Sequence, residues 1–210
     1  TNARLKYTIE RLGINKFREE VEKLCGFKLE KPRDFEFEDN GDRYGWIEDH
    51  EGNFHYTMFV ENGRVYDTEE YPLLTGLREI AKIHAGDFRL TANQNLIIAN
   101  VSPAKREEIQ KLMDEYGISE SLNKTGLRLN SMACVALPTC GLSLAEAERY
   151  LPDLLTELEE VIEDAGLHSD EITIRMTGCP NGCARPYIAE IAFVGRAPGK
   201  YNVYLGGGHA

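Results

Sequence analysis

Apolar side chains recur at helical spacing through the first 25 residues of the chain. The pattern is interrupted at Gly13, so it predicts two helices joined by a bend over residues 4–25. The apolar positions are Leu5, Ile9, Leu12, Phe17, Val21 and Leu24. Residues 35–42 are acidic and irregular, and we expect the first domain boundary there.

Alternation of apolar and polar residues, which is typical of a strand, begins at Phe54 and continues to Val60. The dipeptide Asn62-Gly63 then supplies the residues that a tight turn prefers. The sequence therefore predicts a β-hairpin in which residues 64–66 return as the partner strand.

Two further helices are predicted between Pro72 and Gly117. Pro72 opens the first helix, whose buried stripe ends at His84. We interpret His84 as a histidine at the edge of the core rather than as a catalytic group. Ser102 and Pro103 supply the cap and the first residue of the second helix.

Short strands are predicted at residues 88–90 and 96–99, between these two helices. Residues 44–117 therefore have the α+β order of a small antiparallel sheet backed by helices. This order is similar in topology to a ferredoxin-like half-domain.

The last third of the chain predicts a second sheet and a long helix. Ser143 and Glu146 form a capping box, which predicts a helix that begins directly after Cys140. Pro152 restarts this helix, and its apolar face continues to Gly166. The predicted strands are 171–176, 191–194 and 201–205.

Composition narrows the class of protein. The chain has 210 residues, of which 42% are hydrophobic, so it is long enough to bury a substantial core. Its net charge of -11 argues against nucleic-acid binding, which normally requires a basic face. No apolar run is long enough to cross a bilayer, and the first residues do not form a secretory signal, so we expect no membrane association and a cytoplasmic location.

Four of the five cysteines lie in two short loops with the spacings C-x5-C and C-x3-C, and they are Cys134, Cys140, Cys179 and Cys183. Three interpretations are open: a 4Fe-4S cluster with one cysteine per iron, a structural zinc site, or two disulfides. The spacing favours the cluster, because C-x5-C fits a zinc knuckle poorly and nothing in the sequence indicates an oxidising compartment. The fifth cysteine, Cys25, is expected to be a small buried hydrophobe.

The segments around these cysteines, 130–140 and 177–186, resemble the sulfite reductase hemoprotein family and its nitrite reductase relatives. The resemblance extends to residues 44–46, 75–84, 87–99 and 195–202. It implies an α+β protein in which a ferredoxin-like half-domain is followed by an α/β siroheme/4Fe-4S-binding domain. The implied divisions are a helical N-terminal segment (1–40), the half-domain (41–120) and the cofactor-binding domain (121–210), the last truncated at its C-terminus.

The resemblance also implies roles for individual residues. Cys134, Cys140, Cys179 and Cys183 correspond to the ligands of the 4Fe-4S cluster, and Cys183 also bridges to the siroheme iron. Asn181 is small enough to let the macrocycle approach, and Arg185 is a candidate partner for a siroheme carboxylate or for an ordinary ion pair. A second set of candidates would line the cofactor pocket, or would instead form a turn whose amides cap backbone groups: Arg89, Asn93, Gln94 and Asn95.

The function that the resemblance implies is the six-electron reduction of sulfite to sulfide in sulfur assimilation, with siroheme nitrite reductase as the alternative. A non-catalytic apo fragment of the same fold is a third interpretation. Family members are more than twice as long, so the chain is expected to be a C-terminal half that needs the missing N-terminal half. No catalytic residue is assigned, because the arginines and lysines that bind sulfite are expected in that half. The implied electron donor is an NADPH flavoprotein or a ferredoxin.

Overall fold

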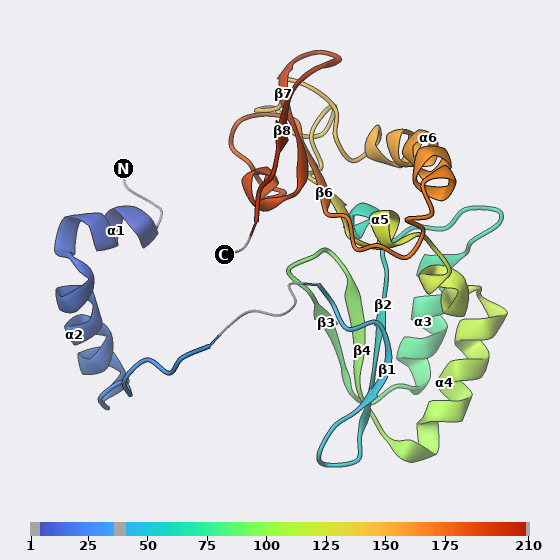
Figure 1. The fold of residues 1–210 in the computed structure, drawn as a ribbon. Coiled ribbons are helices and arrows are strands. Elements are labelled where there is room, and N and C mark those ends of the chain that lie inside the picture. Colours follow the sequence, from blue (N-terminus) through green and yellow to red (C-terminus); the bar gives the residue numbers. More distant parts are fainter. Residues whose placement is uncertain (1–4, 36–40, 209–210) are drawn as a thin grey trace. The chain divides into compact units, whose positions relative to one another are not determined.

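The structure, a computed structural model, describes residues 5–35 and 41–208. The chain divides into two compact units, residues 1–38 and 39–210. Because the positions of these parts relative to one another are not determined, each unit is described by itself (Figure 1).

The first unit consists of two helices, as the apolar pattern predicts. Helix α1 (Leu5–Leu12) and helix α2 (Ile14–Cys25) meet at Gly13, whose φ of 77° provides the bend. The prediction for Cys25 is wrong: this residue is exposed. The reason is that none of the described residues of α2 is buried, so the end of this helix offers no core to a small apolar side chain.

The second unit begins with an antiparallel sheet covered on one side by helices α3 (Leu73–Ile83) and α4 (Pro103–Glu115) (Figure 1). Its strand order is β1-β2-β4-β3, and the strands are β1 (Gly45–Glu48), β2 (Phe54–Met58), β3 (Asp87–Leu90) and β4 (Leu96–Val101). Side chains from the sheet and both helices meet in one core that includes Met58, Ile98, Ile80, Ile109 and Met113. The two predicted helices and the strands 88–90 and 96–99 are confirmed.

The predicted hairpin at Asn62-Gly63 is wrong. Residues Glu61–Gly63 form a short 3-10 turn, η1, and residues 64–66 are not a strand. The partners of β2 are β1 on one side and β4 on the other, so both of its hydrogen-bonding edges are already occupied. Asn62 and Gly63 do have the positive φ angles that their residue types favour, 51° and 71°, but they turn the chain out of the sheet.

A second, mixed sheet follows, with the strand order β5-β6-β7-β8. Strands β5 (Ser131–Ala133), β6 (Ile174–Thr177) and β7 (Ile191–Ala197) are parallel, and β8 (Lys200–Leu205) returns antiparallel to β7. Helix α6 (Leu151–Asp164) belongs to the β5–β6 crossover and packs on this sheet through Leu151 and Leu155. The remaining short elements are η2 (Ile118–Leu122), α5 (Gly126–Leu129) and η3 (Pro186–Ile188).

The capping box predicted at Ser143 does not begin a helix, because α6 starts only at Leu151. The backbone N–H groups of Leu144 and Ala145 instead both donate to the carbonyl oxygen of Gly178. The Ser143 hydroxyl donates to the Ala145 carbonyl oxygen and not to a helical N–H. Residues 143–145 are therefore held against another loop rather than wound into a helical turn.

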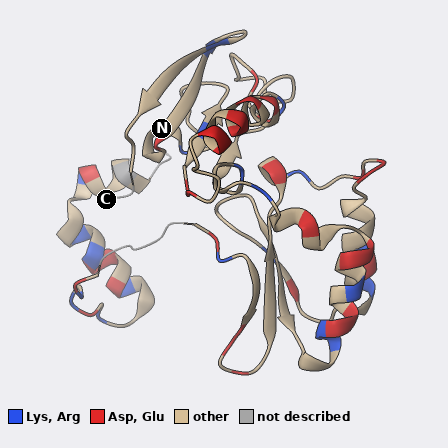
Figure 2. Cartoon of the chain, turned by 45° about the vertical axis from the view of Figure 1, so that its right-hand side comes forward, with Lys and Arg blue, Asp and Glu red and all other residues tan. Residues whose placement is uncertain are grey.

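Acidic side chains concentrate on the helices of the second unit. Asp and Glu residues lie along α4 and α6, whereas the two sheets carry few charges (Figure 2). Among the residues that the structure describes, no helix is long and apolar enough to cross a membrane.

Replacement of Ile98 by alanine tests the first core. Ile98 is fully buried on the central strand β4, so Ile98→Ala is expected to lower the free energy of unfolding by about 2–5 kcal/mol through lost burial and a residual cavity. The measurement is a denaturant titration followed by circular dichroism. The control is Leu90→Ala on β3, where the side chain is 86% exposed and the expected change is within about 0.5 kcal/mol. Equal losses at the two positions would contradict this packing.

Candidate functional site

The two cysteine loops leave the same edge of the second sheet. Strands β5 and β6 are parallel and in register at Ala133 and Met176, so their carboxyl ends lie together. Cys134 follows β5 directly, and its N–H donates to the Met176 carbonyl oxygen at 3.1 Å. Cys179 comes two residues after the end of β6. The carboxyl edge of parallel strands is where α/β sheets usually bind ligands.

The loops also contact each other directly through Gly178. Its carbonyl oxygen accepts from the N–H groups of Leu144 and Ala145 at 2.8 and 3.0 Å, and its own N–H donates to the sulfur of Cys134 at 3.3 Å. A Cβ atom at this position would lie 1.9 Å from Ser143 Oγ and 2.5 Å from the Ala145 carbonyl oxygen. Only glycine fits this close approach of one backbone to another.

The four sulfurs differ in exposure. Cys179 is buried, Cys134 and Cys140 are half-buried, and Cys183 is exposed. Burial raises the pKa of the Cys134 thiol, the hydrogen bonds from the Gly178 and Ala136 N–H groups lower it, and the charges of Cys183 and Cys179 raise it further. A bound cationic group would favour the deprotonated state that metal ligation requires.

Within the described residues, no group of three or more His, Cys, Asp or Glu side chains converges on a point that could hold one metal ion. Four thiolates around a single zinc ion would lie about 3.8 Å apart, given a Zn–S distance of about 2.3 Å in a tetrahedron. An iron–sulfur cluster needs less convergence, because each cysteine binds a different iron. The donor set, four cysteines from two adjoining loops, fits a cluster by its chemistry, and the assignment of all four as its ligands stays a prediction.

The amides predicted near the cofactor lie in the turn between β3 and β4. Asn95 is 1% exposed, and its side chain accepts from the Val60 N–H and donates to Asp42 and to the Tyr44 hydroxyl. The Gln94 amide donates to the Ala133 carbonyl oxygen, and Asn93 Oδ1 accepts from Arg185. These bonds are the ones expected of a turn that caps neighbouring backbone. A role in lining a cofactor pocket stays a prediction for the three amides.

The remaining predicted residues lie as follows. Arg89 is an exposed residue of β3 that forms an ion pair with Asp87 at 3.2 Å. Asn181 is exposed in the segment between Cys179 and Cys183. His84 is half-buried at the end of α3, and its ring stacks edge-on against Phe88, which agrees with a position at the edge of the core.

Arg175 is a residue of the site that the sequence did not single out. It lies on β6, is 3% exposed, and donates through Nη1 to the carbonyl oxygen of Arg185 at 3.3 Å, while its Nε has no hydrogen-bond partner among the described residues. Burial, followed by the positive charge of Arg185, lowers the pKa of Arg175 to about 10. Strand β6 alternates apolar and polar residues, so nothing in its sequence distinguishes Arg175 from an ordinary strand residue.

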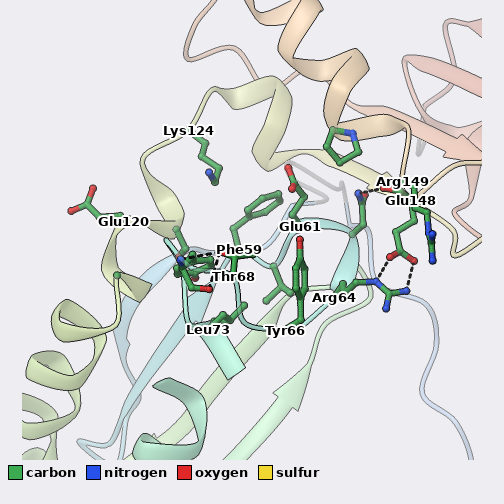
Figure 3. A pocket seen from close by; sticks show the side chains of 16 residues that line it. Phe59, Glu61, Arg64, Tyr66, Thr68, Leu73, Glu120, Lys124, Glu148 and Arg149 are labelled. Atoms are coloured by element: carbon green, nitrogen blue, oxygen red, sulfur yellow. Dashed lines mark hydrogen bonds and ion pairs between the residues drawn. The ribbon is translucent and has the colours of Figure 1, made fainter. Parts of the chain in front are cut away.

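A pocket of about 650 Å³ lies beside the first cysteine loop, between the segment after β2 and the residues before α6 (Figure 3). Arg64 crosses its wall and makes two hydrogen bonds to the carboxylate of Glu148. The backbone N–H of Glu148 donates to the Cys134 carbonyl oxygen at 3.1 Å, and its carbonyl oxygen accepts from the Asn62 amide at 3.0 Å. Glu148 therefore connects this wall to the cysteine loop.

Replacement of Gly178 tests the contact between the loops. Gly178→Ala is expected to lower the free energy of unfolding by about 1–3 kcal/mol, because the new methyl group would overlap backbone and side-chain atoms that cannot easily move. The measurement is chemical denaturation of the metal-free chain. Gly141→Ala, next to Cys140, is the matched control, since a Cβ atom there meets nothing within 4 Å. A similar effect of both variants would argue against the close approach at Gly178.

Comparison with known proteins gives consistent matches. Residues 47–116 match the family described as "Nitrite/Sulfite reductase ferredoxin-like half domain". The chain is 64% identical over 207 residues to the "Sulfite reductase [NADPH] hemoprotein beta-component" of Staphylococcus haemolyticus, covering 99% of the chain and 36% of that protein. The protein of the same name from Bacillus subtilis is 60% identical over 205 residues, covering 98% of the chain and 36% of that protein.

Among solved structures, the chain is similar to the NirA protein of Mycobacterium tuberculosis. The TM-score is 0.76 and the identity 31%, over 98% of this chain and 39% of that one. The chain thus spans roughly a third of the length of the relatives it matches. The expected α+β fold with a ferredoxin-like half-domain is confirmed. The chain therefore belongs to the sulfite and nitrite reductase family, as the motifs around its cysteines predict.

Proposed function

We propose that this chain is the cluster-carrying part of a siroheme/4Fe-4S sulfite reductase, which reduces sulfite to sulfide with six electrons. The observation that carries the proposal is the arrangement of two cysteine loops at one sheet edge, packed together through Gly178. Cys134, Cys140, Cys179 and Cys183 would hold the cluster. When bound, the cluster and siroheme supply storage and delivery of electrons.

The residues of the second loop have distinct roles in this proposal. Cys183 is exposed, and in this proposal it would hold the siroheme as well as the cluster. Asn181 is an exposed small residue that leaves room for the macrocycle. Backbone N–H groups, such as that of Gly178 toward Cys134, hold the sulfurs and adjust their electron density.

The proposal divides the chain into a helical segment (1–40), a ferredoxin-like half-domain (41–120) and a cofactor-binding domain (121–210). The relatives are named as NADPH-dependent beta-components, which supports an NADPH flavoprotein over a ferredoxin as the electron donor. We propose the cytoplasm as the compartment, because its reducing conditions keep cysteines such as these five as free thiols. Sulfite binding and proton delivery are assigned to an N-terminal half that this chain does not contain, so the isolated chain is proposed to be inactive.

Nitrite is the second candidate substrate, because the matching family covers nitrite as well as sulfite reductases. The relatives at 60–64% identity carry the sulfite name, which places sulfite first. Steady-state kinetics of the full-length gene product with each anion would separate the two. A higher kcat/KM for nitrite would reverse the order.

Single Cys→Ser variants of the full-length gene product test the ligand set. Changes at positions 134, 140, 179 and 183 are each expected to reduce bound iron and acid-labile sulfide to less than about half, because each removes one of four thiolate ligands. Cys25→Ser is the matched control and is expected to retain wild-type iron and sulfide, since Cys25 lies on the helix of the first unit. Stoichiometric zinc without acid-labile sulfide in the native protein would instead support the structural zinc interpretation.

A further inference from the structure

The turn between β3 and β4, residues 91–95, is held rigidly in place. The Thr91 hydroxyl oxygen accepts from the N–H groups of Asn93 and Asn95, each at 3.1 Å, and donates to Asp42. Asn95, at its end, is anchored by four different hydrogen bonds to Val60, Thr91, Asp42 and Tyr44. Because the turn is fixed to the first sheet, residues that bond to the turn are held in place relative to that sheet.

One contact of this turn is with the last residue of β5, the strand that leads into the first cysteine loop. Gln94 Nε2 donates to the carbonyl oxygen of Ala133 at 2.9 Å. Ala133 is fully buried and directly precedes Cys134. The Gln94 backbone has a φ of 68°, a conformation that a non-glycine residue adopts at an energetic cost, and it directs the side chain from the first sheet to the second.

A second contact of the same turn is with the other cysteine loop. Arg185 Nη2 donates to the Ala92 carbonyl oxygen at 2.7 Å and to Asn93 Oδ1 at 2.8 Å. Arg185 comes two residues after Cys183, and its backbone has a φ of 53°. Its carbonyl oxygen accepts from Arg175, so β6, the end of the loop and the turn form one continuous network.

These two contacts matter because the strands that lead into the loops are paired over a short length. The β5–β6 ladder consists of three residue pairs, and beyond it the two loops are joined by the hydrogen bonds of Gly178, so few contacts fix their separation. Gln94 and Arg185 supply two further restraints from a single turn, one at the end of β5 directly before Cys134 and one two residues after Cys183. A group bound by cysteines of both loops is retained only while the separation of the loops is maintained.

We infer that the 91–95 turn is a positioning element for the cluster, in which Gln94 and the Arg185–Asn93 contact set the separation of the two cysteine loops. The inference rests on the proposed function, since it presupposes a cluster held by both loops. In this inference Gln94 and Arg185 act through the cysteine loops and are positioning residues. They therefore control how long the cluster is retained and at what potential it is reduced.

The test uses the full-length holoenzyme with substitutions that remove one donor each. Gln94→Met preserves the length of the side chain but cannot donate to Ala133, and Arg185→Met cannot donate to the turn. Each variant is expected to release its cluster at least about tenfold faster than the wild type in the presence of an iron chelator. The release rate is measured from the loss of visible absorbance. The midpoint potential of the cluster is expected to shift in both variants. Arg185→Lys keeps the charge and one donor, and is expected to recover part of the wild-type retention.

Two control variants separate positioning from general destabilisation. Gln110→Met removes hydrogen bonds to Trp46, Asp114 and Ser119 within the half-domain, and Arg196→Met removes an exposed cation from β7 of the second sheet. Both are expected to keep the wild-type release rate and potential.

Wild-type release rates and potentials in Gln94→Met and Arg185→Met would overturn this inference alone and leave the cluster assignment intact. Equal changes in the Gln110→Met control would also overturn it. A wild-type protein that holds no cluster would overturn the proposed function and this inference together.

Discussion

The parallel ladder between β5 and β6 is the constraint on which the arrangement of the cysteines depends. Parallel pairing brings the two carboxyl ends to one edge, although about forty residues of chain separate them. The crossover that parallel strands require is filled by α6, which packs on the sheet through Leu151 and Leu155. The hydrogen bonds of Gly178 then join the loops just beyond the ladder. A pair of antiparallel strands in the same place would have sent the two loops to opposite edges.

The two sheets of the second unit are held together by polar contacts at several places. Arg128, on α5, is the most connected of these residues: it bonds to Glu159 and Thr156 of α6 and to Glu61 of η1. Hydrogen bonding to Glu159 raises the pKa of Arg128, and the return bond lowers the pKa of Glu159, so both stay charged at neutral pH. The bond from Arg128 to Glu61 joins α5 to the segment after β2, whereas the Arg128–Glu159 pair fixes α5 against α6.

Helices and strands with a clear apolar periodicity could be predicted from the sequence. Elements whose conformation depends on contacts with distant parts of the chain could not. Helices α3 and α6 have apolar stripes, so their existence followed from pattern, whereas α4 followed from the cap Ser102 and from Pro103. Strand β5 has only three residues, too few to show any alternation, and its pairing with β6 is a long-range contact that no local pattern encodes. Ser143 begins a good helix-capping sequence, but no helix forms there, because the N–H groups of the next two residues bond to the Gly178 carbonyl oxygen instead. The cysteines were found because their residue type is rare and clustered, whereas Arg175 resembled an ordinary strand residue.

The charges near the second cysteine loop oppose the overall charge of the chain. The chain has a net charge of -11, yet Arg175 and Arg185 approach each other beside this loop. The pKa of Arg175 falls to about 10 because burial penalises its charge, but that value is still well above neutral pH, so the guanidinium stays protonated. Two cations held together in a partly buried place repel each other, and that repulsion is relieved by negative charge nearby. Arg185 lies two residues after Cys183, so a negatively charged group held by this loop would relieve that repulsion.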